Sequence, residues 1–158
     1  LEGYDVMLLD TGAGIAETVL QFNLLAPRNI VVLNRELTSI TDAYALMKVM
    51  HQIFGRDAFS LVVNAVADDR EGEKIFRHVD GICRRFLGFA ADYLGPVYRD
   101  EAVPQSILRQ EPLVLADPGS KTSACFGRIA GALQRRGRPS PPVQAIVKTE
   151  VGARGILH

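Results

Sequence analysis

The chain has 158 residues, and its 18 basic side chains balance 18 acidic ones, so its formal net charge is zero. A hydrophobic fraction of 47% and a charged fraction of 23% are those of an ordinary globular domain. The charge balance provides no field that would attract nucleic acid or anionic lipid, and no apolar run approaches the roughly 18 residues that span a bilayer.

Four short apolar runs are typical of buried strands. Each is almost continuously apolar, which is the pattern of a strand covered on both faces. The predicted strands are Asp5–Asp10, Asn29–Asn34, Phe59–Ala65 and Tyr93–Val97.

The intervals between these runs carry helical patterns. After Thr38 and Ser39, one of which we expect to cap a helix, apolar residues recur at three- and four-residue spacing as far as Gly55, which favours a helix end. The other predicted helices are Ile15–Leu25, Glu71–Leu87, Glu101–Arg109 and Lys121–Arg136.

Alternating strands and helices predict an α/β domain with a mostly parallel sheet and helices on both faces. We expect this domain to cover residues 1–136. Beyond it, the stretch GRPSPP cannot continue a helix, so residues 137–158 are predicted as a Pro- and Gly-containing tail. Within the tail, Val143–Thr149 is either an edge strand or simply extended.

Polar residues stand where three of the predicted strands end: Asp10-Thr11-Gly12, Asn34 and Asn64. Ligands of parallel sheets bind at such ends. A carboxylate here can hold Mg²⁺ beside phosphates, and the amides of Gly12 and Gly14 can approach a phosphate closely. Alternatively, Asp10 caps the following helix and the glycines form a tight turn. The residues alone leave both interpretations open.

Other motifs are excluded. The run Gly12-Ala13-Gly14-Ile15-Ala16-Glu17 begins like a dinucleotide-binding loop but has glutamate at the third glycine position. No Walker A loop is present. Cys83 and Cys125 stand far apart and indicate buried, reduced thiols rather than a zinc site.

Several segments resemble one family of nucleotide-binding proteins. YDVMLLDTGAGI is similar to the second nucleotide segment of MinD/ParA-type ATPases, and ELTSITDAYALMKVM is similar to a stretch of the flagellar-number regulators of that class. FSLVVNAV resembles the strand that ends in an adenine-facing asparagine, and DYLGPVYRDEAVPQSILRQEPLV resembles the segment that follows. The resemblance runs in order from about Tyr4 to Leu133.

The resemblance implies a role for each matching residue. Asp10 is the expected catalytic and metal residue, because it would hold Mg²⁺ through water and help to order the hydrolytic water. Thr11, Gly12 and Gly14 would contact the nucleotide, with the Gly14 amide on the γ-phosphate. On the base side the expected residues are Asn64, Arg99 and Asp100. As alternatives, Asn64 caps the next loop, and Asp100 with Glu101 only starts a helix.

The resemblance further implies the cofactors ATP and Mg²⁺, an ATP-dependent homodimer and a cytoplasmic location. The implied partners are flagellar basal-body proteins or a flagellar transcription regulator, without direct binding of nucleic acid and without a membrane span. We also expect no membrane binding through the tail, because VQAIVKTEVGARGILH has few basic residues and two glycines.

The resemblance also implies that a part is missing. The family's deviant Walker A loop would precede Leu1, so we expect a P-loop NTPase-like fold that is incomplete at the N-terminus, in the C-terminal portion of a MinD-like ATPase. An ATP hydrolase is then expected only in the intact protein, and this chain alone should be inactive. Within the chain, Val97-Tyr98 replaces the family's Ile-Pro near the adenine loop.

Two other functions stay open. One is a nucleotide-free protein-interaction module on the same scaffold. The other is a receiver-like signalling domain, which YDVMLLD also resembles, although the required acidic pair and lysine are missing. Whatever the function, Arg70, Lys74, Arg77 and Arg84 fall near one face of a helix, which is either a solvated face or a docking surface for an acidic partner.

Overall fold

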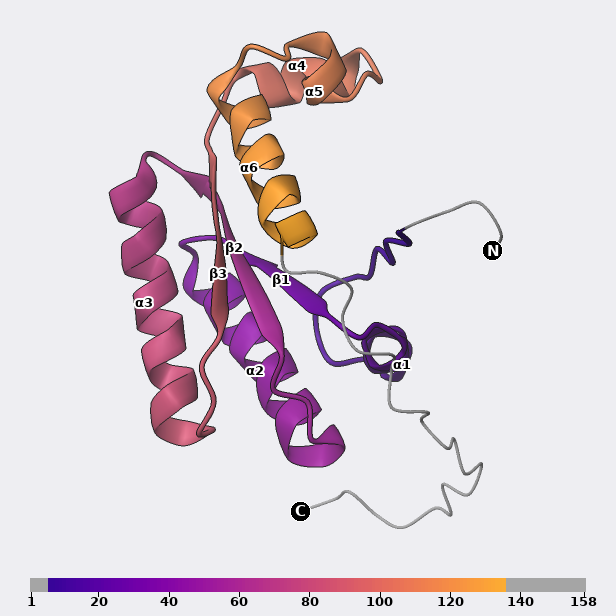
Figure 1. Cartoon of the computed structure of the whole chain (residues 1–158), viewed down its shortest axis with the longest axis vertical. Helices are drawn as coiled ribbons and strands as arrows, with labels where there is room; N and C mark the ends of the chain where they lie inside the picture. Colours follow the sequence, from indigo (N-terminus) through magenta and orange to yellow (C-terminus); the bar gives the residue numbers. More distant parts are fainter. Residues whose placement is uncertain (1–5, 136–158) are drawn as a thin grey trace.

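A three-stranded parallel sheet forms the centre of the protein (Figure 1). The computed structural model describes residues 6–135. The strands lie side by side in sequence order: β1 (Asn29–Leu33), β2 (Phe59–Val66) and β3 (Asp92–Tyr98). The parallel sheet confirms the predicted α/β class, and three of the four predicted strands are present.

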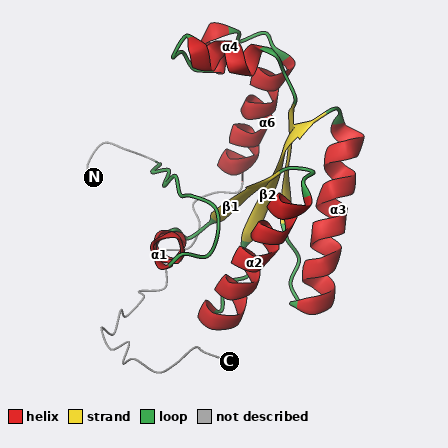
Figure 2. Ribbon diagram, turned by 180° about the vertical axis from the view of Figure 1, so that it is seen from behind, coloured by secondary structure: helices red, strands yellow, loops and turns green. Residues whose placement is uncertain are grey.

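Six helices surround the sheet within the described residues. Figure 2 shows two long helices, α2 and α3, on one side of the sheet and α6 on the other, which confirms the prediction of helices on both faces. The helices are α1 (Glu17–Leu25), α2 (Leu37–Phe54), α3 (Asp69–Phe86), α4 (Ala102–Leu108), α5 (Leu113–Ala116) and α6 (Lys121–Arg135). The single turn of α5 was not expected from the sequence.

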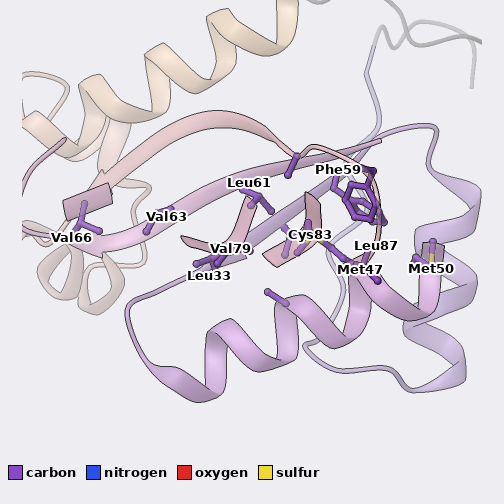
Figure 3. Packing of buried hydrophobic residues seen from close by; sticks show 14 residues of the cluster. Leu33, Met47, Met50, Phe59, Leu61, Val63, Val66, Val79, Cys83 and Leu87 are labelled. Atoms are coloured by element: carbon purple, nitrogen blue, oxygen red, sulfur yellow. The ribbon is translucent and has the colours of Figure 1, made fainter. Parts of the chain in front are cut away.

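The larger hydrophobic core lies between the sheet and the helices α2 and α3 (Figure 3). Met47 and Met50 of α2 are fully buried against Leu61 and Phe59 of β2, and Cys83 reaches the same core from α3. Burial of apolar surface stabilises the folded state by about 25 cal/mol per Å². Because this core contains most of the buried apolar residues, it is the main stabilising layer of the fold. A smaller cluster on the opposite face joins Val62, Leu94, Val97 and Cys125.

The predicted strand Asp5–Asp10 is not present. Residues 6–10 pair with no strand of the described sheet, and Val6, Met7 and Leu8 are exposed by 73%, 62% and 81%. An apolar run becomes a strand only where its amides find a ladder partner and its side chains are covered, and residues 6–10 have neither. Asp5 lies outside the described residues.

The predicted cap of α2 is also wrong. The helix begins at Leu37, so Thr38 and Ser39 lie inside its first turn. The Ser39 hydroxyl instead accepts a hydrogen bond from the Asn34 N–H at 3.0 Å, and Asn34 Oδ1 accepts one from the Glu36 N–H at 2.8 Å. The predicted end is confirmed, because Gly55 adopts the left-handed conformation with φ 65°.

The end of α3 nearest the strand ends is well defined by hydrogen bonds. Asp68 caps the helix by accepting from the Glu71 N–H at 2.8 Å, and the Glu71 side chain accepts from the Ala67 N–H at 2.6 Å. The helix therefore begins two residues before the predicted Glu71. Residues 136–158, which include the predicted tail and the segment Val143–Thr149, lie outside the described part of the chain.

Candidate nucleotide site

The three parallel strands present their carboxyl ends at one edge of the sheet. Leu33, Val66 and Tyr98 are the last residues of β1, β2 and β3. Asn34 follows β1 and Arg99 follows β3, whereas Asn64 lies inside β2, two residues before its end. This edge is where ligands of open α/β sheets bind.

The loop around Asp10 lines a cavity of about 440 Å³. This cavity brings together the four residues predicted for the phosphate and metal side. Gly14 has φ 95°, a conformation that glycine adopts easily and other residues rarely adopt. The lining residues are Leu9, Asp10, Thr11, Gly12, Ala13, Gly14, Asn23, Ile30, Val31, Val32, Thr38, Ser39, Asp42, Ala43 and Leu46.

Four polar side chains of this cavity, those of Asn23, Thr38, Ser39 and Asp42, were not predicted as site residues. Thr38 and Asp42 stand one turn apart on α2, and Asn23 comes from α1, where its amide donates to the Val19 carbonyl at 2.8 Å. The spacing of Thr38 and Asp42 by four residues is a visible signal that both lie on one side of the helix. No comparable pattern in the sequence indicates Asn23.

The chemistry of the lining suits a metal ion better than a polyphosphate. Asp10 and Asp42 provide carboxylate oxygens and Thr11 a hydroxyl, which are the donor types that Mg²⁺ prefers. The described residues that line the cavity include no lysine or arginine. Within residues 6–135, no group of three or more His, Cys, Asp or Glu side chains is arranged to hold a metal ion by itself. A bound Mg²⁺ would therefore need water or phosphate oxygens as further ligands.

Asn64 stands at an irregularity in β2. The register between β2 and β3 shifts between Val63 and Val66, and Ala65 has φ 57°, which is rare for a residue with a side chain. This bulge leaves Asn64 exposed, although its neighbour Val63 is fully buried. Such local strain is common at binding sites. The Asn64 Oδ1 atom accepts a hydrogen bond from the Ala65 N–H at 2.9 Å, as the capping alternative expects.

Arg99 lies directly beside this bulge. Its backbone N–H donates to the Val66 carbonyl at 2.8 Å, and its Nη2 atom approaches the Ala65 carbonyl at 3.5 Å. The structure therefore brings Asn64 and Arg99 together at the ends of β2 and β3. Neither residue lines the cavity around Asp10, so the two predicted halves of the site form separate groups.

Asp100 caps the start of α4. Its carboxylate accepts from the Ala102 N–H at 2.9 Å. This backbone hydrogen bond is the main cause that lowers the pKa of Asp100 below its usual value, and a hydrogen bond from the Thr122 side chain is the second. The alternative in which Asp100 helps to start a helix thus agrees with its contacts.

Tyr98 is a residue near the predicted base side that the sequence did not single out for a role. Its hydroxyl donates to Asp69 at 2.7 Å and accepts from Arg128 at 3.3 Å. The Arg128 guanidinium lies 5.7 Å from the centroid of the Tyr98 ring, within the range of a cation–π contact. Tyr98, the residue before Arg99, thereby connects β3 to α3 and α6.

The four basic residues predicted for one helix face are all exposed on α3. Arg77 contacts Glu73 at 2.5 Å, and Arg84 contacts Asp80 at 2.7 Å. Arg70 and Lys74 form no ion pair with another described residue.

None of the described helices is both long and apolar enough to cross a membrane.

Comparisons with known proteins address the family. No family model matches the chain. The antiactivator FleN of Pseudomonas aeruginosa is 33% identical over 141 residues, which are 89% of this chain and 50% of FleN. The flagellum site-determining protein YlxH of Helicobacter pylori is 26% identical over 134 residues, or 84% of this chain and 45% of YlxH.

The chain is homologous to FleN and YlxH. It spans about half the length of these curated relatives. Among solved structures, the MinD cell division protein of Aquifex aeolicus matches with a TM-score of 0.66 and 23% identity, over 87% of this chain and 56% of MinD. The fold is therefore the MinD-like, P-loop NTPase-like α/β fold that the resemblance implied.

Proposed function

We propose that this chain is part of a MinD-like ATPase that regulates the number or placement of flagella. The observation that carries the proposal is the homology to FleN, which is named an antiactivator, and to YlxH, which is named a flagellum site-determining protein. The scaffold has the fold of MinD. Both relatives extend well beyond the segment that this chain spans, so the activity is proposed for a longer protein.

In this proposal the two groups of site residues bind the two ends of ATP. Asp10 holds Mg²⁺ through water and orders the attacking water, while Thr11, Gly12 and Gly14 contact the phosphates. At the other end, Asn64 hydrogen-bonds the adenine edge and the loop of Arg99 and Asp100 flanks the base. Positive charge is needed beside the phosphates, because the cavity residues described above provide only carboxylates, hydroxyls and amides.

Binding of ATP would then drive formation of a homodimer, and a partner would stimulate hydrolysis. The proposed partners are a flagellar basal-body protein and a flagellar transcription regulator, and the proposed compartment is the cytoplasm. A switch from the ATP to the ADP state would be sensed by the Gly12–Gly14 loop, whose amide contacts would depend on the γ-phosphate.

The test compares this chain with a form extended at its N-terminus. ATP–Mg²⁺ binding is measured by calorimetry and turnover by phosphate release, each for the wild type and for Asp10→Ala. We expect turnover in the extended form and its loss in Asp10→Ala. Thr18→Ala, which changes an exposed residue of α1 outside the cavity, is the matched control. Absence of binding and turnover from both forms would refute the ATPase proposal.

One observation favours a second function, a protein-interaction module that does not use nucleotide. The Asp10 group and the Asn64 group form separate sets, and the cavity lining lacks a cation among the described residues. For such a module, the extended form would bind its flagellar partner with the same affinity in the presence and absence of ATP. A nucleotide-dependent change in that affinity would exclude the module.

A further inference from the structure

The helix α3 contains two glycines, and the fold explains only one of them. At Gly72 an added Cβ would lie 2.7 Å from Tyr93 Oη and 2.9 Å from Pro96 Cβ, so the close approach of α3 to β3 requires glycine there. At Gly81 an added Cβ would meet nothing within 4 Å, and the residue is exposed. Glycine in the middle of a helix weakens it, and nothing within this fold compensates for the weakness at Gly81.

Gly81 lies in the middle of a row of basic side chains. Because 3.6 residues complete a helical turn, residues spaced alternately by four and three fall on one stripe. Here that stripe consists of Arg70, Lys74, Arg77, Gly81 and Arg84, with Arg85 beside it, and we call it the α3 cationic stripe. Every one of these residues is exposed, and α3 stands at the outer side of the molecule in both Figure 1 and Figure 2.

Three of the four acidic residues of α3 accept hydrogen bonds from groups outside this stripe. Asp69 accepts from the Tyr98 hydroxyl, and Glu71 accepts from the Ala67 N–H. Asp80 is only 12% exposed in its side chain. The Asp80 Oδ1 atom accepts a hydrogen bond from the buried Ala91 N–H at 2.8 Å.

The stripe consequently keeps positive charge that the protein does not neutralise. Glu73 and Asp80 pair with Arg77 and Arg84, but each of these arginines remains more than 60% exposed in its side chain. Arg70 and Lys74 have no ion-pair partner among the residues that the structure describes. A partner with carboxylates can therefore gain contacts with the stripe without breaking buried interactions.

From this arrangement we propose that the α3 cationic stripe docks an acidic helix of a partner protein, with the closest approach of the two helices at Gly81. The four-and-three spacing matches the spacing of side chains on a second helix, and a residue without a side chain lets the two backbones come close. The balanced charge of the whole chain, 18 basic against 18 acidic residues, disfavours a nucleic acid as the ligand. This inference does not depend on nucleotide binding.

The test uses the 158-residue chain and a synthetic helical peptide of about 20 residues, with glutamates at matching four- and three-residue spacing and alanine between them. Binding is followed by fluorescence anisotropy, and by changes in the amide NMR signals of α3. We expect saturable binding that weakens as salt is raised. A peptide with lysine in place of each glutamate should not bind.

Charge reversal locates the site. Arg70→Glu with Lys74→Glu should weaken binding of the acidic peptide about tenfold or more, because both are unpaired cations of the stripe. Lys48→Glu with Arg109→Glu changes the net charge equally at exposed positions on α2 and after α4, and should alter the Kd by less than about twofold.

A substitution at Gly81 separates docking from simple charge attraction. Gly81→Leu should raise the Tm by a few degrees, because it replaces a glycine inside a helix, and yet weaken peptide binding about fivefold or more. Gly127→Leu, at an exposed glycine of α6 that also has no neighbour within 4 Å, should raise the Tm without changing binding.

Three results would overturn the proposal. The first is that the acidic peptide shows no saturable binding. The second is that its binding is unchanged both in the double variant Arg70→Glu with Lys74→Glu and in Gly81→Leu. The third is that a 20-base-pair DNA duplex binds more tightly than the peptide at the same salt concentration. The last result would assign the stripe to nucleic acid instead.

Discussion

The Tyr98 hydroxyl donates a 2.7 Å hydrogen bond to Asp69, and this contact joins the end of β3 to the first turn of α3. The two residues are 29 positions apart in the chain. The hydrogen bond to Asp69 raises the pKa of Tyr98, and the hydrogen bond from Arg128 opposes that shift. Because only residues 67–68 separate β2, with its bulge at Asn64, from α3, Tyr98 helps to hold the proposed base side in place.

Removing the Tyr98 hydroxyl should weaken the contact between β3 and α3. For Tyr98→Phe we expect the free energy of unfolding to fall by about 0.5–1.5 kcal/mol, the usual contribution of one hydrogen bond. Urea denaturation followed by circular dichroism gives the value. Tyr44→Phe is the control, because the Tyr44 hydroxyl has no hydrogen bond to a described residue, and it should change stability by less than about 0.5 kcal/mol. Equal effects of the two variants would contradict the role of the Asp69 contact.

Gly72 and Gly81 form a matched pair within one helix. Gly72→Ala should lower the free energy of unfolding by about 1–2 kcal/mol, because the added methyl group overlaps Tyr93 Oη and Pro96 Cβ. The Tyr93 ring cannot simply rotate away, since it stacks on Phe76 with centroids 4.6 Å apart. Gly81→Ala adds the same methyl group in open space and should raise stability by about 0.5–1 kcal/mol. Destabilisation by both substitutions would show that the contact at Gly72 is not the cause.

Asp80 is a buried acceptor that ties α3 to the segment before β3. In Asp80→Ala the buried Ala91 N–H would lose its acceptor, and Arg84 would lose its partner. We expect a loss of about 1–3 kcal/mol, the cost of a buried polar group without a partner. Glu73→Ala breaks the exposed pair with Arg77 in the same helix, and should cost less than about 1 kcal/mol. Chemical denaturation of both variants measures the difference.

The Cys83 thiol and the Tyr93 hydroxyl should make the stability of the protein fall in alkaline solution. Burial, and to a smaller extent the charge of Asp80, raises the pKa of Cys83 from 9.0 to about 11. Burial is also the main cause that raises the pKa of Tyr93 from 10.0 to about 12. Between about pH 9 and pH 11 the unfolded chain releases these protons while the native protein keeps them, so the native state loses relative stability as pH rises.

The measurement is the urea midpoint at several pH values from 8 to 10.5. The midpoint of the wild type should fall with rising pH, and Cys83→Ala should fall less steeply because one of the two groups is removed. Below pH 8.5 the two slopes should agree. An identical slope for both proteins throughout the range would mean that the Cys83 thiol titrates normally in the native state.

Periodicity predicted most of the fold, because helices and buried strands leave local patterns. The spacing of Met47 and Met50 located α2, and Gly55 marked its end correctly. Residues 6–10 show the limit of such patterns. Their apolar character indicates burial, but whether a strand forms depends on a neighbouring strand that no local pattern reveals.

The candidate site was predictable in part. The four residues expected on the phosphate side, Asp10, Thr11, Gly12 and Gly14, line one cavity. Asn64 and Arg99 were expected on the base side, and they lie close together. The bulge that exposes Asn64 involves a positive φ at an alanine, for which the sequence gives no sign. The link between Tyr98 and Asp69 was equally hidden, because it depends on how β3 and α3 meet in space.

The all-parallel pairing of the sheet has a consequence for how the chain folds. Parallel neighbours cannot be joined by a tight turn, so β1 meets β2 only after α2 has crossed back, and β2 meets β3 only after α3 has done the same. Each strand pairing therefore closes a loop of some 30 residues, and local hairpins cannot nucleate the sheet. The two long helices are thus expected to govern the folding rate, and substitutions that strengthen α3 at solvent-facing positions should accelerate refolding as well as stabilise the native state.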